Sequence, residues 1–97
     1  MRNTKLYNVL DHINQFAFCD GKKSIFQSYD SVCCIIDRKK NLITFWKDRN
    51  YSKTTRKHLY AFLYDNNIWL YNWKDVENAI KDKEYRYYKV KYDNNLY

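Results

Sequence analysis

The chain of 97 residues contains no proline and a single glycine, Gly21. Linkers, collagen-like segments and β-sandwiches with many turns are rich in these two residues, so we exclude those three classes. No apolar run reaches the roughly 18–20 residues that a membrane-spanning helix requires. Apolar residues make up 45% of the sequence, which is enough for one core, and we expect a single domain over residues 1–97.

Signals for export and for metal binding are also missing. The first residues lead into an amphipathic segment and not into the apolar stretch of a signal peptide, so we expect a cytoplasmic protein without a membrane partner. The cysteines at positions 19, 33 and 34 form no CxxC pair, and this odd number indicates reduced, mostly buried thiols. Without a glycine-rich phosphate loop, an HExxH motif or an acidic cluster, we expect neither a metal nor a cofactor.

Positive charge is in excess, and it is concentrated in one segment. Residues 38–58 contain eight of the 18 Lys and Arg residues and one acid, Asp48, whereas the rest of the chain is formally neutral. This segment therefore accounts for the whole net charge of +7. Such an excess predicts an acidic partner. The alternative is that a charged face simply meets solvent.

The first half of the sequence predicts a helix followed by three strands. Apolar residues recur at helical spacing near the start, which predicts a helix over residues 4–17. The repeated positions are Leu6, Val9, Leu10, Ile13 and Phe16. Strands are expected over residues 24–28, 32–36 and 42–46. A short polar break separates the last two, which should therefore form an antiparallel hairpin.

The second half predicts two more helices and a last strand. One helix should run from Lys53 or Thr54 to Tyr64, and another should begin after an Asn72 cap. Alternation over residues 85–92 predicts the final strand. The expected fold is α+β, in the order α-β-β-β-α-α-β, with helices packed on one face of a small antiparallel sheet of three or four strands.

The helix predicted to start near Lys53 carries a basic face apart from its apolar face. On such a face, cations can neutralise phosphates and tyrosine rings can stack on bases. We predict that it binds the partner, together with the basic residues that precede it. The predicted contact residues are Arg38, Lys39, Lys40, Lys47, Arg49, Tyr51, Lys53, Arg56, Lys57 and Tyr60. Whether the loop at residues 38–40 lies on the same side is open.

Hydroxyl groups cluster where this helix begins. Ser52, Thr54 and Thr55, with the free backbone N–H groups of the first turn, predict an anion site. The same side chains can instead cap the helix, with Thr55 on its inner face. His58 follows Thr54 by one turn and can bond back to the helix start.

Catalysis would have to depend on the two histidines, His12 and His58. Two histidines with a lysine or tyrosine would suit RNA cleavage by a small basic toxin, but the sequence does not define their separation. We therefore expect no catalytic residue and a protein that is not an enzyme.

Residues 51–63 resemble a family of small uncharacterised proteins from phages and plasmids of Gram-positive bacteria. The recurring pattern is Tyr-Ser-x-Thr-Thr-x-x-His, which here runs from Tyr51 to His58. In that family the pattern opens a helix after a hairpin that starts with a segment like residues 28–32. The resemblance covers residues 24–64. It implies a mobile-element origin and a location in the cytoplasm of a bacterial host.

These observations favour a protein that acts by binding. We expect a phage or mobile-element accessory protein that inhibits a host defence complex, in the manner of an anti-CRISPR protein, or other nucleic-acid-handling machinery. The partner would be acidic, either a host protein, a ribonucleoprotein complex or nucleic acid. A direct DNA- or RNA-binding protein is the first alternative, and a small ribonuclease toxin is the second. Exposed Tyr and Trp side chains would also suit a homodimer interface.

Overall fold

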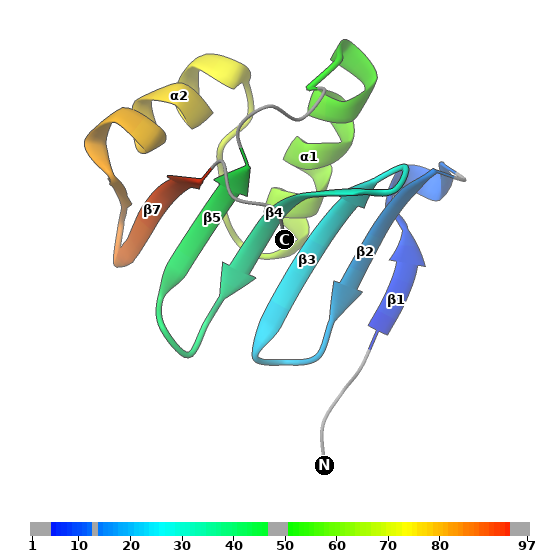
Figure 1. The fold of residues 1–97 in the computed structure, drawn as a ribbon, viewed down its shortest axis with the longest axis horizontal. Coiled ribbons are helices and arrows are strands. Elements are labelled where there is room, and N and C mark those ends of the chain that lie inside the picture. The colour runs from blue at the N-terminus through cyan, green and yellow to red at the C-terminus, as the bar shows by residue number, and fades with distance from the viewer. Residues whose placement is uncertain (1–4, 13, 47–50, 94–97) are drawn as a thin grey trace.

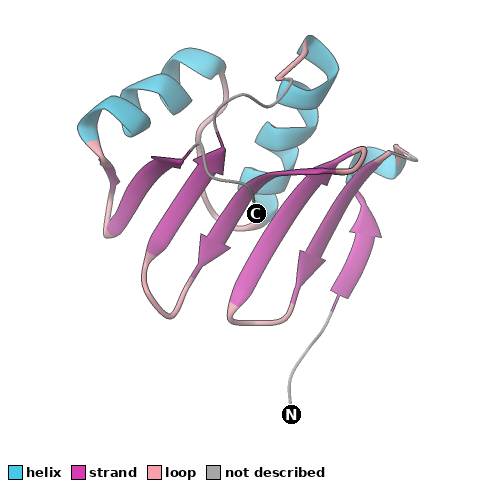
Figure 2. Cartoon of the chain, viewed as in Figure 1, coloured by secondary structure: helices cyan, strands magenta, loops and turns pink. Residues whose placement is uncertain are grey.

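The computed structural model describes residues 5–12, 14–46 and 51–93. Its elements form two layers, a sheet and a layer of helices (Figures 1 and 2). The strands are β1 (Lys5–Asn8), β2 (Gln15–Cys19), β3 (Lys23–Ser28), β4 (Ser31–Asp37), β5 (Leu42–Trp46), β6 (Glu84–Tyr85) and β7 (Tyr88–Asp93). The helices are the 3-10 turn η1 (Val9–Asp11), α1 (Lys53–Asp65) and α2 (Trp73–Asp82).

The seven strands make one mixed sheet in the order β1-β2-β3-β4-β5-β7-β6. Strands β1 to β5 pair antiparallel with their sequence neighbours, and β6 pairs antiparallel with β7. In contrast, β7 runs parallel to β5, from Leu42 opposite Lys89 to Trp46 opposite Asp93. A parallel neighbour requires a crossover connection. Helices α1 and α2 form this crossover.

The predicted sheet of three or four antiparallel strands, in the order α-β-β-β-α-α-β, is therefore wrong. The largest error is the helix over residues 4–17, because the described residues of this segment contribute to β1, η1 and β2. Leu6 and Leu10 fit the helical spacing but are 70% and 56% exposed. Leu10 adopts φ 51°, which interrupts any helix there. The described apolar residues that repeat at helical spacing therefore belong to two strands and a turn. These elements bury different faces.

The prediction of one strand over residues 85–92 is also wrong, because the structure has a hairpin there. Arg86, at φ 55°, and Tyr87 make the turn between β6 and β7. The predicted hairpin of residues 32–36 and 42–46 is confirmed, with Ile36 opposite Ile43. The helices beginning near Lys53 and after Asn72 are confirmed as well.

The core lies between the sheet and the two helices. Phe26 and Phe45 point from the sheet toward Leu59, Phe62 and the other buried side chains of the helices. Cys33 and Cys34 are buried, and Cys19 is half-buried. In the described part of the chain, no helix has both the length and the apolar composition needed to cross a membrane.

Candidate functional site

The start of α1 is fixed by hydroxyl groups. Ser52 is the N-cap, and its Oγ accepts a hydrogen bond from the backbone N–H of Thr55 at 3.2 Å. The Ser52 hydroxyl also donates to Thr55 Oγ1, which lies 3.1 Å from Ser28 Oγ on β3. The hydroxyls of Ser52 and Thr55 thus have protein partners, whereas the side chain of Thr54 is exposed.

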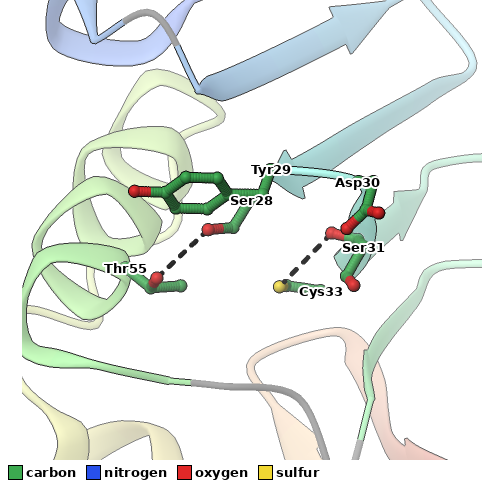
Figure 3. Close-up of a pocket in the computed structure, with 6 residues that line it drawn as sticks. All are labelled: Ser28, Tyr29, Asp30, Ser31, Cys33 and Thr55. Atoms are coloured by element: carbon green, nitrogen blue, oxygen red, sulfur yellow. Dashed lines mark hydrogen bonds between the residues drawn. The ribbon is translucent and has the colours of Figure 1, made fainter.

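A small pocket of about 210 Å³ opens beside this helix start (Figure 3). It is lined by Ser28, Tyr29, Asp30, Ser31, Cys33 and Thr55. Cys33 stands where the register between β3 and β4 shifts, because Cys34 pairs with Phe26 and Val32 pairs with Gln27. The carboxylate of Asp30 opposes an anion electrostatically, so this pocket adds nothing to the predicted anion site.

The two histidines are neighbours in space. The ring centroids of His12 and His58 are 5.0 Å apart, with the rings edge to face at 74°. His58 is 5% exposed, and its Nδ1 lies 2.7 Å from the carbonyl oxygen of Thr54, one turn back. His12 Nδ1 accepts a hydrogen bond from the backbone N–H of Asn14 at 3.1 Å. These contacts are those of packed rings that hold η1 against α1.

Tyr51 joins the lead-in of α1 to the sheet. Its hydroxyl lies 2.7 Å from the carbonyl oxygen of Trp46 and 3.0 Å from that of Cys33. Its ring lies 4.8 Å from the ring of Trp73 on α2. Burial raises the pKa of Tyr51 above its ordinary value of 10.0. The structure thus places this predicted contact residue in a packing position.

Four of the predicted contact residues line an open groove on α1. They are Lys53, Arg56, Lys57 and Tyr60, which we call the α1 groove. The first turn of α1 contains no acid that would neutralise these cations. The Arg56 guanidinium lies 4.5 Å from the centre of the Trp73 ring, and its buried Nε has no hydrogen-bond partner among the described residues. Trp73 lies on α2, so the spacing of residues within α1 could not link it to this groove.

Arg38 lies at the other end of α1. Its Nη2 donates hydrogen bonds to Ser24 Oγ at 2.8 Å and to the Oδ1 of Asn66, the C-cap of α1. The amide of Asn66 in turn donates to the carbonyl oxygen of Phe62 at 2.8 Å. The α1 groove ends at Tyr60, so Asn66 and Arg38 lie beyond it along the helix.

The predicted contact residues therefore do not form one surface. Lys39 and Lys40 are exposed in the β4–β5 turn, next to Arg38 and away from the α1 groove. Lys47 and Arg49 lie outside the described residues. Among the residues that the structure describes, no group of three or more His, Cys, Asp or Glu side chains could hold a metal ion.

One buried polar side chain was not singled out from the sequence. Gln15 is fully buried, and within the described part of the chain neither its amide oxygen nor its amide nitrogen has a hydrogen-bond partner. It pairs with Ser28 across β2 and β3, so its side chain projects from the same sheet face as the Ser28 hydroxyl. Sequence alternation could have placed it on the core face only if β2 had been recognised as a strand.

Comparison with protein families gives a match over residues 3–86 to a family of unknown function, DUF8033. No curated protein matches the chain. No solved structure matches it either.

Proposed function

The chain belongs to the DUF8033 family, and we propose that it acts by binding an acidic partner through the α1 groove. The observation that carries this proposal is that Lys53, Arg56 and Lys57 line one groove with Tyr60 beside them. Three cations within two turns of helix create a positive potential that attracts acidic surfaces. The first turn of α1 contains no acidic residue that would weaken this positive potential.

Arg56 supports this proposal because it is already positioned. Its guanidinium packs over Trp73, a contact of the kind that stabilises a cation by about 0.5–1 kcal/mol at exposed sites. A side chain that is ordered before binding loses less conformational entropy when the partner arrives. Arg56 would therefore anchor the contact, and the flexible Lys53 and Lys57 would add charge around it.

The setting we propose is a phage or mobile element in a bacterial host. The pattern from Tyr51 to His58, which resembles that of phage and plasmid proteins, supports this origin. An accessory protein with a basic groove would inhibit a host defence complex, as anti-CRISPR proteins do, or another nucleic-acid-handling complex, by covering an acidic surface that the complex needs. Catalysis has no part in this proposal.

The test compares two charge-reversed variants of equal net charge. Lys53→Glu with Lys57→Glu changes the α1 groove, and Lys74→Glu with Lys81→Glu changes the exposed face of α2. Two Lys→Glu substitutions each remove one positive and add one negative charge, so both variants fall from +7 to +3. Arg56 is left in place because it also packs on Trp73. A glutamate near the start of α1 favours the helix dipole, so the groove variant should stay folded.

The measurement is size-exclusion chromatography with light scattering on protein purified from a bacterial host, before and after nuclease and high salt. We expect the wild type and the α2 variant to keep a stoichiometric acidic partner and the groove variant to lose it. Retention of the partner by the groove variant would contradict the proposal. If the bound species is nucleic acid and leaves with salt, direct nucleic-acid binding replaces inhibition of a protein complex.

A ribonuclease is the second candidate, because the His12 and His58 rings lie 5.0 Å apart. The low exposure of His58 and its contact with the helix backbone favour packing over catalysis. A purified chain that cleaves RNA, and whose His12→Ala variant does not, would put this candidate first.

A further inference from the structure

Four connecting segments meet at the end of the sheet away from the α1 groove. The parts that meet are residues 20–22, 38–41, 66–69 and 86–87. Strands β3, β5 and β7 start at this end and β2 and β4 finish there, since Lys23 pairs with Asp37 and Leu42 with Lys89. In Figure 1 the β2–β3 and β4–β5 turns form the lower edge of the sheet.

Hydrogen bonds connect these segments to one another. The backbone N–H of Arg38 donates to the carbonyl oxygen of Lys22 at 2.8 Å, and that of Lys89 donates to Asn41 at 2.8 Å. The hydroxyl of Tyr85 accepts a hydrogen bond from the backbone N–H of Trp69 at 3.1 Å. These bonds hold the segments together as one continuous surface.

The surface is basic. Lys22, Lys39, Lys40 and Arg86 are all exposed on it. The one acid within the four segments is Asp20, whose carboxylate accepts hydrogen bonds from the backbone N–H groups of Lys22 and Lys23. Three further acids, Asp37, Asp65 and Glu84, lie next to these segments in the sequence. Asp37 is nearly buried. The exposed cations of the four segments therefore outnumber the acids that could neutralise them.

Two large aromatic side chains are exposed among these cations. Trp69 is 44% exposed and Tyr87 is 71% exposed. The Arg86 guanidinium lies 4.4 Å from the centre of the Trp69 ring, and the ring of Tyr87 stacks on Tyr88 at 4.7 Å. Each ring is supported on one side by a neighbour, while a substantial part of it still reaches solvent.

We propose that this surface binds a single strand of nucleic acid, with Trp69 and Tyr87 stacking on bases and the four cations contacting phosphates. We call it the turn surface (Lys22, Lys39, Lys40, Trp69, Arg86 and Tyr87). Base stacking needs unpaired bases, which a duplex does not offer. An acidic peptide would pair with the cations but would leave the two rings without partners. The combination of rings and cations therefore favours a single strand.

The turn surface is separate from the α1 groove and does not depend on the function proposed for that groove. The α1 groove is lined by residues from Lys53 to Tyr60, and the turn surface lies beyond the C-terminal end of α1 at Asp65. One molecule could therefore hold a partner at one end and a strand at the other.

The experiment measures fluorescence anisotropy with a labelled 20-nucleotide oligo(dT), an oligo(U) of the same length and a matched DNA duplex. Three double variants are compared with the wild type. Trp69→Ala with Tyr87→Ala removes the rings, and Lys39→Glu with Lys40→Glu reverses charge on the turn surface. Lys74→Glu with Lys81→Glu, on the exposed face of α2, is the control. The last two have the same net charge, +3 by the count given above.

The wild type should bind the single strands at least about tenfold more tightly than the duplex. Removing the rings should weaken strand binding by at least about tenfold, with the salt dependence unchanged. Reversal of Lys39 and Lys40 should weaken binding and also flatten the salt dependence, by about 0.7 in the log–log slope for each lost phosphate contact. The α2 control should stay within about threefold of the wild type.

Equal weakening by the two charge-reversed variants would overturn the proposal, because it would indicate attraction by net charge alone. Equal binding of strand and duplex would also overturn it. If the ring variant unfolds, Tyr87→Ala alone is used, since this side chain is mostly exposed, and unchanged strand affinity in that folded variant would again count against the proposal. A turn-surface variant that loses strand binding but still captures the acidic partner would show that the turn surface and the α1 groove act separately.

Discussion

Thr55 connects three parts of the fold through a single hydroxyl group. It contacts Ser52 in the cap and Ser28 at the end of β3, and its side chain is 2% exposed. Removing a buried hydroxyl leaves its partners unsatisfied, which costs more than the net value of the hydrogen bond itself. Thr55, together with Ser52, thus holds the start of α1 on the sheet, while His58 in the same pattern packs against His12 at the end of η1.

Thr55→Val should lower the free energy of unfolding by about 1–3 kcal/mol, because valine keeps the shape and loses the hydroxyl. Thr54→Val is the matched control, since Thr54 is exposed and its side chain should contribute less than about 0.5 kcal/mol. Urea unfolding followed by circular dichroism gives both values. Equal losses in the two variants would show that the Thr55 hydroxyl is not a special contact.

At the scale of elements, α1 is held at both ends by polar side chains from the sheet. Ser28 meets its start, and Ser24 and Arg38 meet Asn66 at its end. These contacts position the helix along the sheet. They also explain why the α1 groove and the turn surface face different ends of the molecule.

Asn66→Ala should lower the free energy of unfolding by about 2–3 kcal/mol, because Ser24 and the guanidinium of Arg38 lose their buried acceptor. Asn67→Gly is the contrasting variant. Asn67 adopts φ 63°, which glycine accepts without strain, so this change should be neutral or slightly stabilising. Thermal and urea unfolding of the two variants give the comparison, and a harmless Asn66→Ala would disprove the proposed anchoring.

At the scale of the whole molecule, stability at high pH should depend on two half-buried tyrosines, Tyr51 and Tyr7. Burial raises the pKa of Tyr51, and the same effect together with Asp65 raises the pKa of Tyr7, whose hydroxyl donates to that carboxylate at 3.1 Å. The unfolded chain ionises near the ordinary value of 10.0, before the folded chain does. Ionisation therefore favours unfolding, and the stabilising contribution is complete below pH 9 and declines as the pH rises above 10.

The urea midpoint should fall between pH 9 and 11, and Tyr51→Phe should make this fall smaller while lowering the midpoint at pH 7 by the loss of a hydrogen bond. Tyr71→Phe, at an exposed position, should behave like the wild type. A Tyr51→Phe variant with the same alkaline decline as the wild type would contradict the role of burial.

The sequence alone predicted those elements whose residues carry a complete local pattern of apolar residues, turns and caps. The hairpin around residues 37–41 has apolar runs on both sides of a polar turn, and α1 and α2 carry caps at Ser52 and Asn72, so their positions were predicted. The basic face of α1 was predicted for the same reason, because residues three and four positions apart share one side of a helix.

Contacts between distant segments decided the rest. Pairing with β1 and β3 makes residues 15–19 a strand, although the segment before them has helical spacing. The crossover through α1 and α2 sets β7 parallel to β5, which brings Arg86 and Tyr87 to the end of the sheet that carries Lys39 and Lys40. The sequence by itself determined that positive charge gathers in residues 38–58 and that α1 has a basic face. Only the tertiary structure divided that charge between two ends of the molecule, because long-range strand pairing leaves no local signal along the chain.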